Sequence, residues 1–203
     1  MSDFGILAFG AYVPITRLQR SAIHATNKWF AGGLGGLAKG EKAVANWDED
    51  SVTMALEAAR DALEGLDRAR IQRVVLASTT LPFGDRQNAG IVKEALNLPD
   101  AVGALDVAGS QRAATSALLA ALGGNETTLV AAAELTTPKP ASEREMTSGD
   151  AAAAVLVGTG NPVATLVASH SVTVDFVDHF REAGEAHDYD WEARWVRDEG
   201  IAR

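Results

Sequence analysis

Two spacings of apolar residues follow one another along most of the chain. Short, nearly unbroken apolar runs have the length of buried strands, and longer stretches repeat apolar residues at the 3.6-residue period of a helix. The runs predict strands, and the periodic stretches predict helices. The strands are expected at 5–14, 73–78, 102–107, 128–133, 151–157 and 163–168, and the helices at 47–64, 86–96 and 111–122. Strands that alternate with helices and are apolar on both faces indicate an α/β fold with a mostly parallel, helix-covered sheet.

Three signals for helix ends and turns refine this pattern. Asp50 or Ser51 can cap the first long helix, which Gly65 ends. The sequence 158–161, Gly-Thr-Gly-Asn, is typical of a hairpin turn and predicts that the last two strands pair with each other.

The pattern also indicates how the chain is organised. Residues 1–170 are expected to form the core-building body, interrupted at about 21–46 by a glycine-rich insertion that we expect to be a mobile, closely packed loop. Residues 171–203 are polar and are expected to form a helical extension. Its Trp191 and Trp195 are spaced to share one helix edge, where they are expected to dock.

Composition and charge exclude several classes of protein. The chain has 203 residues, 47% of them hydrophobic and 22% charged, which is enough to bury a real core. Its net charge of -9, with no run of Lys or Arg, argues against binding to nucleic acid or anionic lipid. Apolar stretches too short for a bilayer and an N-terminus without signal-peptide features predict a cytoplasmic protein.

The chemistry of cofactors and metals finds little support in the sequence. The chain has no cysteine, so a disulfide, a thiolate metal site and a cysteine nucleophile are all excluded. Glycines at 35–40 have the spacing of a phosphate loop, but Glu41 stands where that loop needs lysine. The histidines lack the spacing of a helical metal site. We therefore expect no metal and no tightly bound cofactor.

The segment 105–118 carries the strongest chemical signal. A buried strand ends there in a tight turn and leads directly into an alanine-rich helix, so Ser110 is expected at a helix N-terminus. Backbone N–H groups and the helix dipole favour negative charge at such a place, which suits a nucleophile or an oxyanion. From the local sequence alone, a plain strand-to-helix connection with Ser110 as its N-cap is the favoured interpretation.

Several short segments together resemble a known family. They are 5–14, 45–55, 74–80, 105–118 and 148–153. In element order and in these motifs the chain resembles the N-terminal half of the thiolase superfamily. Within it, the likeness is greatest to hydroxymethylglutaryl-CoA synthases of the archaeal and bacterial type and to ketoacyl-ACP synthases III. The resemblance implies the N-terminal half of a thiolase-like fold, with a mostly parallel five-stranded sheet and covering helices.

The resemblance also assigns the site residues. In the family the acyl-accepting cysteine lies five residues after an aspartate that matches Asp106, which places Gln111 at the cysteine position. Ser110 is its neighbour and would be the nucleophile after a shift of one residue. The family's glutamate, a general acid/base, matches Thr79, and threonine does not shuttle protons near neutral pH.

What the resemblance implies for function leaves two alternatives. In the first, the chain is a subunit or half of a thiolase-like acyltransferase that makes or breaks carbon–carbon bonds in acyl-CoA or acyl-ACP thioesters, and is inactive alone. Glutamine at the cysteine position is also found in decarboxylating ketosynthase domains. In the second, the chain is a non-catalytic subunit that shapes another chain's acyl pocket.

The resemblance further implies partners. The family's catalytic His and Asn come from its C-terminal half, which a second polypeptide would supply. A zinc-ribbon/OB-fold protein is a further expected partner. The implied assembly is a dimer or heteromer with the strand 102–107 near the interface.

Overall fold

The computed structural model describes residues 3–201, which form two compact units. Within that range the first unit consists of 3–17, 43–135 and 149–169. The second unit consists of 18–42, 136–148 and 170–201. The first unit contains the large sheet and the candidate site, so it is described in more detail.

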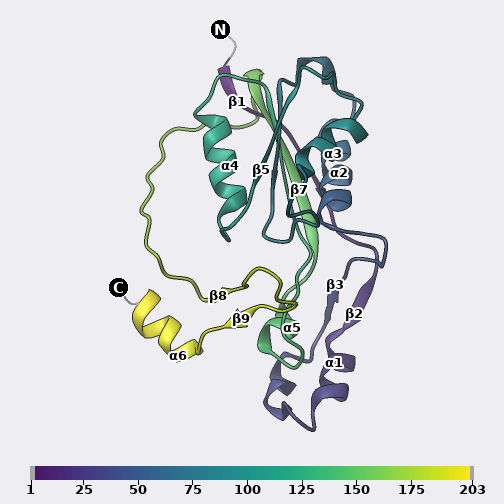
Figure 1. The fold of residues 1–203 in the computed structure, drawn as a ribbon, viewed down its shortest axis with the longest axis vertical. Helices are drawn as coiled ribbons and strands as arrows, with labels where there is room; N and C mark the ends of the chain where they lie inside the picture. Colours follow the sequence, from purple (N-terminus) through teal and green to yellow (C-terminus); the bar gives the residue numbers. More distant parts are fainter. Residues whose placement is uncertain (1–2, 202–203) are drawn as a thin grey trace. The chain divides into compact units, whose positions relative to one another are not determined.

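A five-stranded sheet forms the centre of the first unit (Figure 1). Its strands lie in the order β1-β7-β6-β4-β5. The strands β4, β5 and β6 are parallel to one another, and β7 runs antiparallel to both β6 and β1. Four strands therefore share one direction, which confirms the predicted mostly parallel sheet. The bounds are β1 Asp3–Tyr12, β4 Arg73–Ala77, β5 Gly103–Val107, β6 Thr128–Glu134 and β7 Ala151–Gly160.

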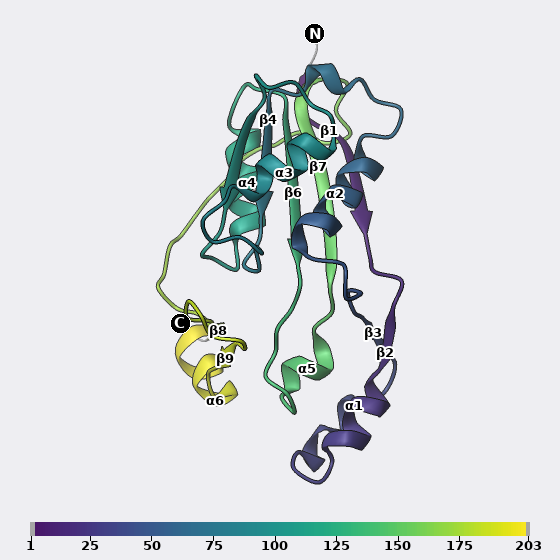
Figure 2. The same ribbon diagram turned by 45° about the vertical axis from the view of Figure 1, so that its right-hand side comes forward.

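Helices cover both faces of this sheet, as Figures 1 and 2 show. Helices α2 and α3 lie on one face and α4 on the other, and each face has its own buried apolar cluster. Their bounds are α2 Ser51–Ala62, α3 Asn88–Ala95 and α4 Ala113–Leu122, with a short 3-10 helix, η2, at Arg68–Arg70. The three predicted helices are confirmed, each somewhat shorter than expected.

Helix α2 begins where its sequence can satisfy the first free N–H groups. The Asp50 side chain accepts hydrogen bonds from the backbone N–H groups of Val52 and Thr53, at 2.9 and 2.8 Å. The Thr53 hydroxyl oxygen accepts one from the Asp50 N–H in return, which completes a capping box. Of the two predicted caps, Asp50 is the correct one. Ser51 is buried and donates to the Thr80 carbonyl instead, at 2.8 Å.

Helix α2 crosses β1 at very short range over Gly10. A Cβ atom placed on Gly10 would lie 2.2 Å from the Ala62 nitrogen and 2.6 Å from the Ala58 oxygen. Both are backbone atoms of α2. Only glycine therefore allows this approach of helix and strand.

The predicted hairpin at the end of the body is wrong. Strand β7 continues through Gly160, and the following segment forms only an isolated antiparallel bridge between Ala164 and Ile6 of β1. The bridge is closed by Ile6 N–H to Ala164 O and Val163 N–H to Ile6 O, both 2.8 Å. The reason is that β7 already has β1 on one edge and β6 on the other, so neither edge can receive a hairpin partner.

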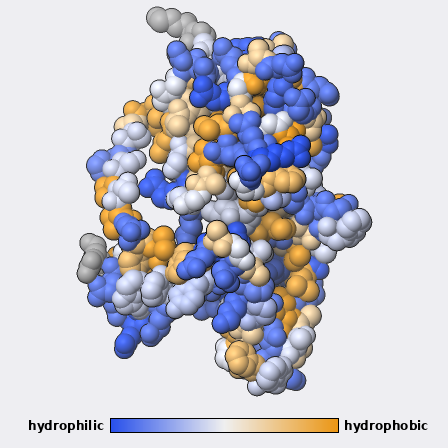
Figure 3. Space-filling view, in the orientation of Figure 1, coloured by the Kyte–Doolittle hydropathy of each residue, from blue (hydrophilic) through white to orange (hydrophobic). Residues whose placement is uncertain are grey.

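The second unit contains short elements. The segment expected to be a glycine-rich loop contains most of α1, a 3-10 helix, η1, and the strand β3, which pairs with β2 just before the segment. Ile23 of α1 is buried, whereas Trp29 and Phe30 are exposed. Figure 3 shows that hydrophobic residues lie among hydrophilic ones on the surface of the protein. The bounds are β2 Arg17–Gln19, α1 Arg20–Asn27, η1 Gly32–Leu37, β3 Glu41–Ala43 and α5 Glu143–Thr147.

Packed aromatic side chains and ion pairs hold the C-terminal part of the second unit together. Trp191 and Trp195 pack on each other with ring centroids 4.8 Å apart, and Phe176 stacks on Trp195 at 5.0 Å. The two tryptophans expected to dock therefore pack within their own segment. Arg144 of α5 pairs with Asp188 at 3.1 Å and with Asp190 at 3.3 Å. The remaining bounds are β8 His179–Phe180, β9 Tyr189–Asp190, α6 Ala193–Trp195 and the π-helix η3 Val196–Ile201.

Asp190, which pairs with Arg144, has a raised pKa. Burial of its carboxyl group raises the pKa, and the nearby positive charge of Arg144 opposes that rise. Within residues 3–201, no helix combines the length and apolar character needed to cross a membrane.

Candidate functional site

The carboxyl ends of three neighbouring parallel strands bring the candidate residues to one edge of the sheet. Ala77 of β4 is in register with Val107 of β5 and with Ala132 of β6. The residues that follow these positions therefore leave the sheet side by side. In α/β sheets, ligands bind in the space beyond the carboxyl ends of the strands. This edge is accordingly the candidate active site.

The turn after β5 carries Ser110 and Gln111. Gly109 has a φ of 76°, in the left-handed region that glycine adopts most readily. The Ser110 hydroxyl oxygen accepts a hydrogen bond from the Arg112 N–H at 3.1 Å, and helix α4 begins only at Ala113. The N-cap of α4 is therefore Arg112 and not Ser110. The helix begins two residues later than predicted. Both Ser110 and Gln111 are exposed.

The loop after β4 carries Thr79, which contacts a carboxylate from the neighbouring strand. Thr79 donates from its backbone N–H to Oε1 of Glu134 at 2.8 Å and from its hydroxyl to Oε2 at 2.9 Å. The Thr80 hydroxyl donates to the same Oε2 at 3.0 Å. Thr79 is exposed and Glu134, the last residue of β6, is half-buried. A carboxylate thus lies directly behind the Thr79 hydroxyl.

Sequence reasoning missed Glu134. The only local signal is a single acidic residue at the end of an otherwise uncharged strand, Thr128–Glu134. Its link to Thr79 depends on the register of β4 and β6, in which Ala77 faces Ala132. Thr79 and Glu134 each follow these aligned residues by two positions.

Asp106 in β5 has a structural task that its sequence context did not reveal. Its carboxylate accepts hydrogen bonds from the backbone N–H groups of Asn88 at 2.7 Å and Ala89 at 2.6 Å, and from the Asn88 side-chain amide at 3.0 Å. The N-cap residue of α3, Gln87, makes no side-chain cap bond. Asp106 therefore caps α3 from the neighbouring strand. It fixes α3 to the strand that leads into the Ser110–Gln111 turn.

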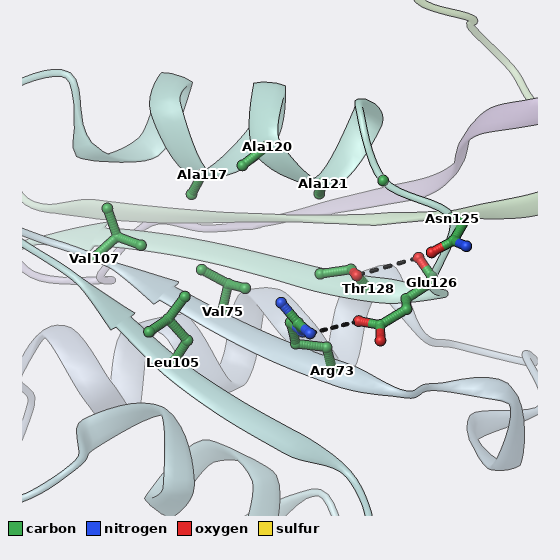
Figure 4. Close-up of a pocket in the computed structure, with 11 residues that line it drawn as sticks. Arg73, Val75, Leu105, Val107, Ala117, Ala120, Ala121, Asn125, Glu126 and Thr128 are labelled. Carbon is green, nitrogen blue, oxygen red and sulfur yellow. Dashed lines mark hydrogen bonds and ion pairs between the residues drawn. The ribbon is translucent and has the colours of Figure 1, made fainter.

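The sheet face beside α4 is partly uncovered (Figure 4). A hollow of about 280 Å³ lies there between α4 and strands β4 and β5. Its floor includes Val75, Leu105 and Val107, and its helix wall consists of the small residues Ala117, Ala120 and Ala121. Arg73 and Glu126 form an ion pair at its rim, at 2.7 Å. Ser110 and Gln111 are not among the residues that line it.

Strand β5 forms one border of the sheet. Among the residues that the structure describes, it pairs with β4 alone, and its other edge carries no strand. Leu105 in this strand is 48% exposed. An apolar side chain and an unpaired strand edge thus lie next to the hollow.

Comparison with known proteins gives a consistent result. No protein-family model matches the chain. It is 32% identical over 194 residues to the hydroxymethylglutaryl-CoA synthase of Pyrococcus furiosus, a match that covers 91% of this chain and 54% of the relative. The hydroxymethylglutaryl-CoA synthase of Methanocaldococcus jannaschii is 31% identical, with coverage of 90% and 55%.

Solved structures agree on the fold. A crystal structure of HMG-CoA synthase complexed with CoA has a TM-score of 0.78 to this chain at 21% identity, and the match covers 92% of this chain and 50% of that one. The chain spans about half the length of the curated relatives it matches. Over nearly all of its length, the chain is thus similar to half of a hydroxymethylglutaryl-CoA synthase, and its fold is that of one half of a thiolase-like enzyme.

Proposed function

We propose that this chain is one half of an acyl-thioester enzyme that makes or breaks carbon–carbon bonds, with Gln111 where its relatives' family has the acyl-accepting cysteine. The observation that carries the proposal is the end-to-end similarity to half of a hydroxymethylglutaryl-CoA synthase in a chain without cysteine. The substrate class is acyl-CoA or acyl-ACP. In the proposal residues 1–170 form the thiolase-like half, with an insertion at about 21–46, and 171–203 extend toward the other half.

The chemistry of Gln111 favours a reaction without an acyl-enzyme. A glutamine amide offers two N–H donors and a carbonyl acceptor, but no nucleophile. Its donors can bind the carbonyl oxygen of a malonyl thioester. When carbon dioxide leaves, the electron pair of the broken bond moves onto the thioester as an enolate, which these donors stabilise. A proton from water then completes an acetyl thioester.

The partly uncovered sheet face beside α4 supports the proposal of a second polypeptide. Leu105 in the apolar floor of the hollow is half-exposed and lies on the border strand of the sheet, where a second polypeptide could bury it. A polypeptide equivalent to the other half of the relatives would cover this face and supply the missing catalytic residues. The unpaired edge of β5 suits a contact in a dimer or heteromer. A zinc-ribbon/OB-fold protein and a cytoplasmic location complete the proposal as predictions from the sequence.

Decarboxylation of malonyl-CoA by the reconstituted complex tests this function. The chain is produced together with the polypeptide that carries the C-terminal thiolase half, complex formation is verified by light scattering, and acetyl-CoA release is followed by chromatography. We expect turnover by the complex and none by the chain alone. Gln111→Ala should lower the rate by about 100-fold, the typical cost of removing an oxyanion donor.

A second glutamine provides the control for this experiment. Gln19 is exposed and its side chain donates to the Glu41 carboxylate at 2.7 Å, outside the candidate site, so Gln19→Ala should leave the rate unchanged. A complex that forms but has no turnover above background would favour the non-catalytic alternative, in which the chain shapes its partner's acyl pocket.

The same complex should not become acetylated on this chain. Because Gln111 cannot form an acyl-enzyme, incubation with acetyl-CoA followed by intact-mass measurement should show no added acetyl group. Peptide mapping of the turn serves as the second readout. A stable acetyl group on Ser110 would refute the role of Gln111 and would make the protein a serine-dependent transferase.

A further inference from the structure

We propose that Glu134 acts through the Thr79 hydroxyl as the proton-accepting carboxylate of the site. The inference rests on the proposed function and adds a residue that neither the motifs nor the relatives' names assign. Glu134 is a positioning residue in this scheme, because Thr79 is the group that faces the ligand. The pair would act on the α-carbon of an acyl thioester.

The Thr79 hydroxyl and the Glu134 carboxylate lie one behind the other, with the hydroxyl on the exposed side. Thr79 is exposed and Glu134 is half-buried behind it, and the Thr79 hydroxyl donates to Glu134 Oε2 at 2.9 Å. This hydrogen bond directs the hydroxyl proton toward the carboxylate. The backbone N–H of Thr79 donates to Oε1, so the carboxylate is fixed at both oxygens. A threonine alone does not take up a proton near neutral pH, but one bonded to a carboxylate can pass its own proton on.

The position of the pair fits the proposed chemistry. Thr79 follows β4 and Gln111 follows β5, and the ends of these adjacent strands are joined by the hydrogen bond from Ser78 N–H to Val107 O at 3.1 Å. Thr79 and Gln111 therefore lie beyond the same edge of the sheet. That arrangement provides an acceptor for a proton and donors for the oxygen of the resulting enolate.

The proton-transfer step balances without another reactant. The C–H bond at the α-carbon of an acetyl thioester breaks, and its electron pair moves into the enolate. The proton passes to Thr79 Oγ1 while the Thr79 proton passes to Glu134 Oε2. Glu134 then exchanges its proton with water, and reversal of the step returns a solvent hydrogen to carbon. In D2O the acetyl group therefore gains deuterium.

Deuterium exchange into acetyl-CoA tests the inference in the reconstituted complex. Exchange is followed by NMR at saturating acetyl-CoA, and thioester binding is measured separately. Glu134→Gln retains an oxygen that can accept from the Thr79 N–H, but it cannot take up a proton. We expect exchange to fall about 100-fold, at the lower end of what general-base catalysis contributes, while the Kd for acetyl-CoA changes by less than about threefold.

Further variants separate proton transfer from a structural role. Thr79→Ser keeps the hydroxyl and should keep most of the exchange, whereas Thr79→Val should lose it. Glu134→Asp should recover part of the rate. In the double variant Thr79→Glu/Glu134→Gln, a carboxylate moved to position 79 should restore exchange, which a purely structural role for Glu134 would not produce.

The matched control is a surface carboxylate outside the candidate site and the hollow. Glu57 of α2 pairs with Arg60 of the same helix, so Glu57→Gln should leave exchange unchanged. A wild-type complex that decarboxylates malonyl-CoA but shows no exchange would overturn this inference alone, whereas a complex with neither activity would overturn the proposed function as well. Wild-type exchange that persists in a folded Glu134→Gln complex would overturn the inference alone.

Discussion

Replacing Asp106 with alanine is expected to lower the melting temperature by about 6 to 12 °C. The substitution leaves the Asn88 and Ala89 N–H groups and the Asn88 side-chain amide without their common acceptor. Asn88 is 1% exposed, so water cannot readily replace the carboxylate there. Lost hydrogen bonds to a charged acceptor and buried donors left unsatisfied cost about 3 kcal/mol in total. For a chain of this length, each kcal/mol lowers the melting temperature by about 2 to 4 °C.

Thermal unfolding followed by circular dichroism measures this effect, with Asp100→Ala as control. Asp100 is fully exposed and shares Lys93 with Glu94, so its removal should change the melting temperature by less than about 2 °C. A melting temperature for Asp106→Ala equal to that of the control would show that α3 does not depend on this cap.

Gly10→Ala should be at least as damaging, because it forces α2 away from the sheet. The added methyl group would meet the backbone of α2 at Ala58 and Ala62, which no side-chain rotation can relieve. Moving α2 would open the buried cluster that includes Met54 and Ala55. We expect a loss of about 3 kcal/mol or more in the free energy of unfolding, from overpacking and the resulting shift.

Urea denaturation provides the measurement, and a second glycine provides the comparison. A Cβ atom on Gly33 meets nothing within 4 Å, so Gly33→Ala should leave the free energy of unfolding within about 1 kcal/mol of the wild type. Equal midpoints for the two variants would contradict the close packing of α2 on β1. If Gly10→Ala is insoluble while Gly33→Ala is soluble, the expectation is also met.

The fold could be predicted where the signal is local. Buried strands such as β4 and β6 stand out as short apolar runs, and α2 is marked by its cap at Asp50. The prediction of a hairpin after β7 failed because the turn signal is local in the sequence, whereas the pairing of the strands depends on distant segments. The edge of β7 that it needed is occupied by β1, which comes from the other end of the unit's sequence.

The candidate site shows the same division. The motif around Asp106 and the strand before Thr79 could be recognised along the sequence, and they mark Gln111, Ser110 and Thr79. Glu134 could not be found in this way, because 55 positions separate it from Thr79 and only the pairing of β4 with β6 brings them together. For the same reason, the sequence marked Asp106 as a reference point for spacing and did not reveal it as the cap of α3.

The unpaired edge of β5 has a consequence for the way a cell would have to produce this chain. Such an edge can accept a strand from any neighbouring polypeptide, and the half-exposed Leu105 adds an apolar contact to that pairing. Aggregation through this edge would grow with the concentration of free chain even if each copy is correctly folded. If a second polypeptide covers this edge, as proposed above, synthesis matched to it in amount and time would protect the chain more effectively than a more stable fold.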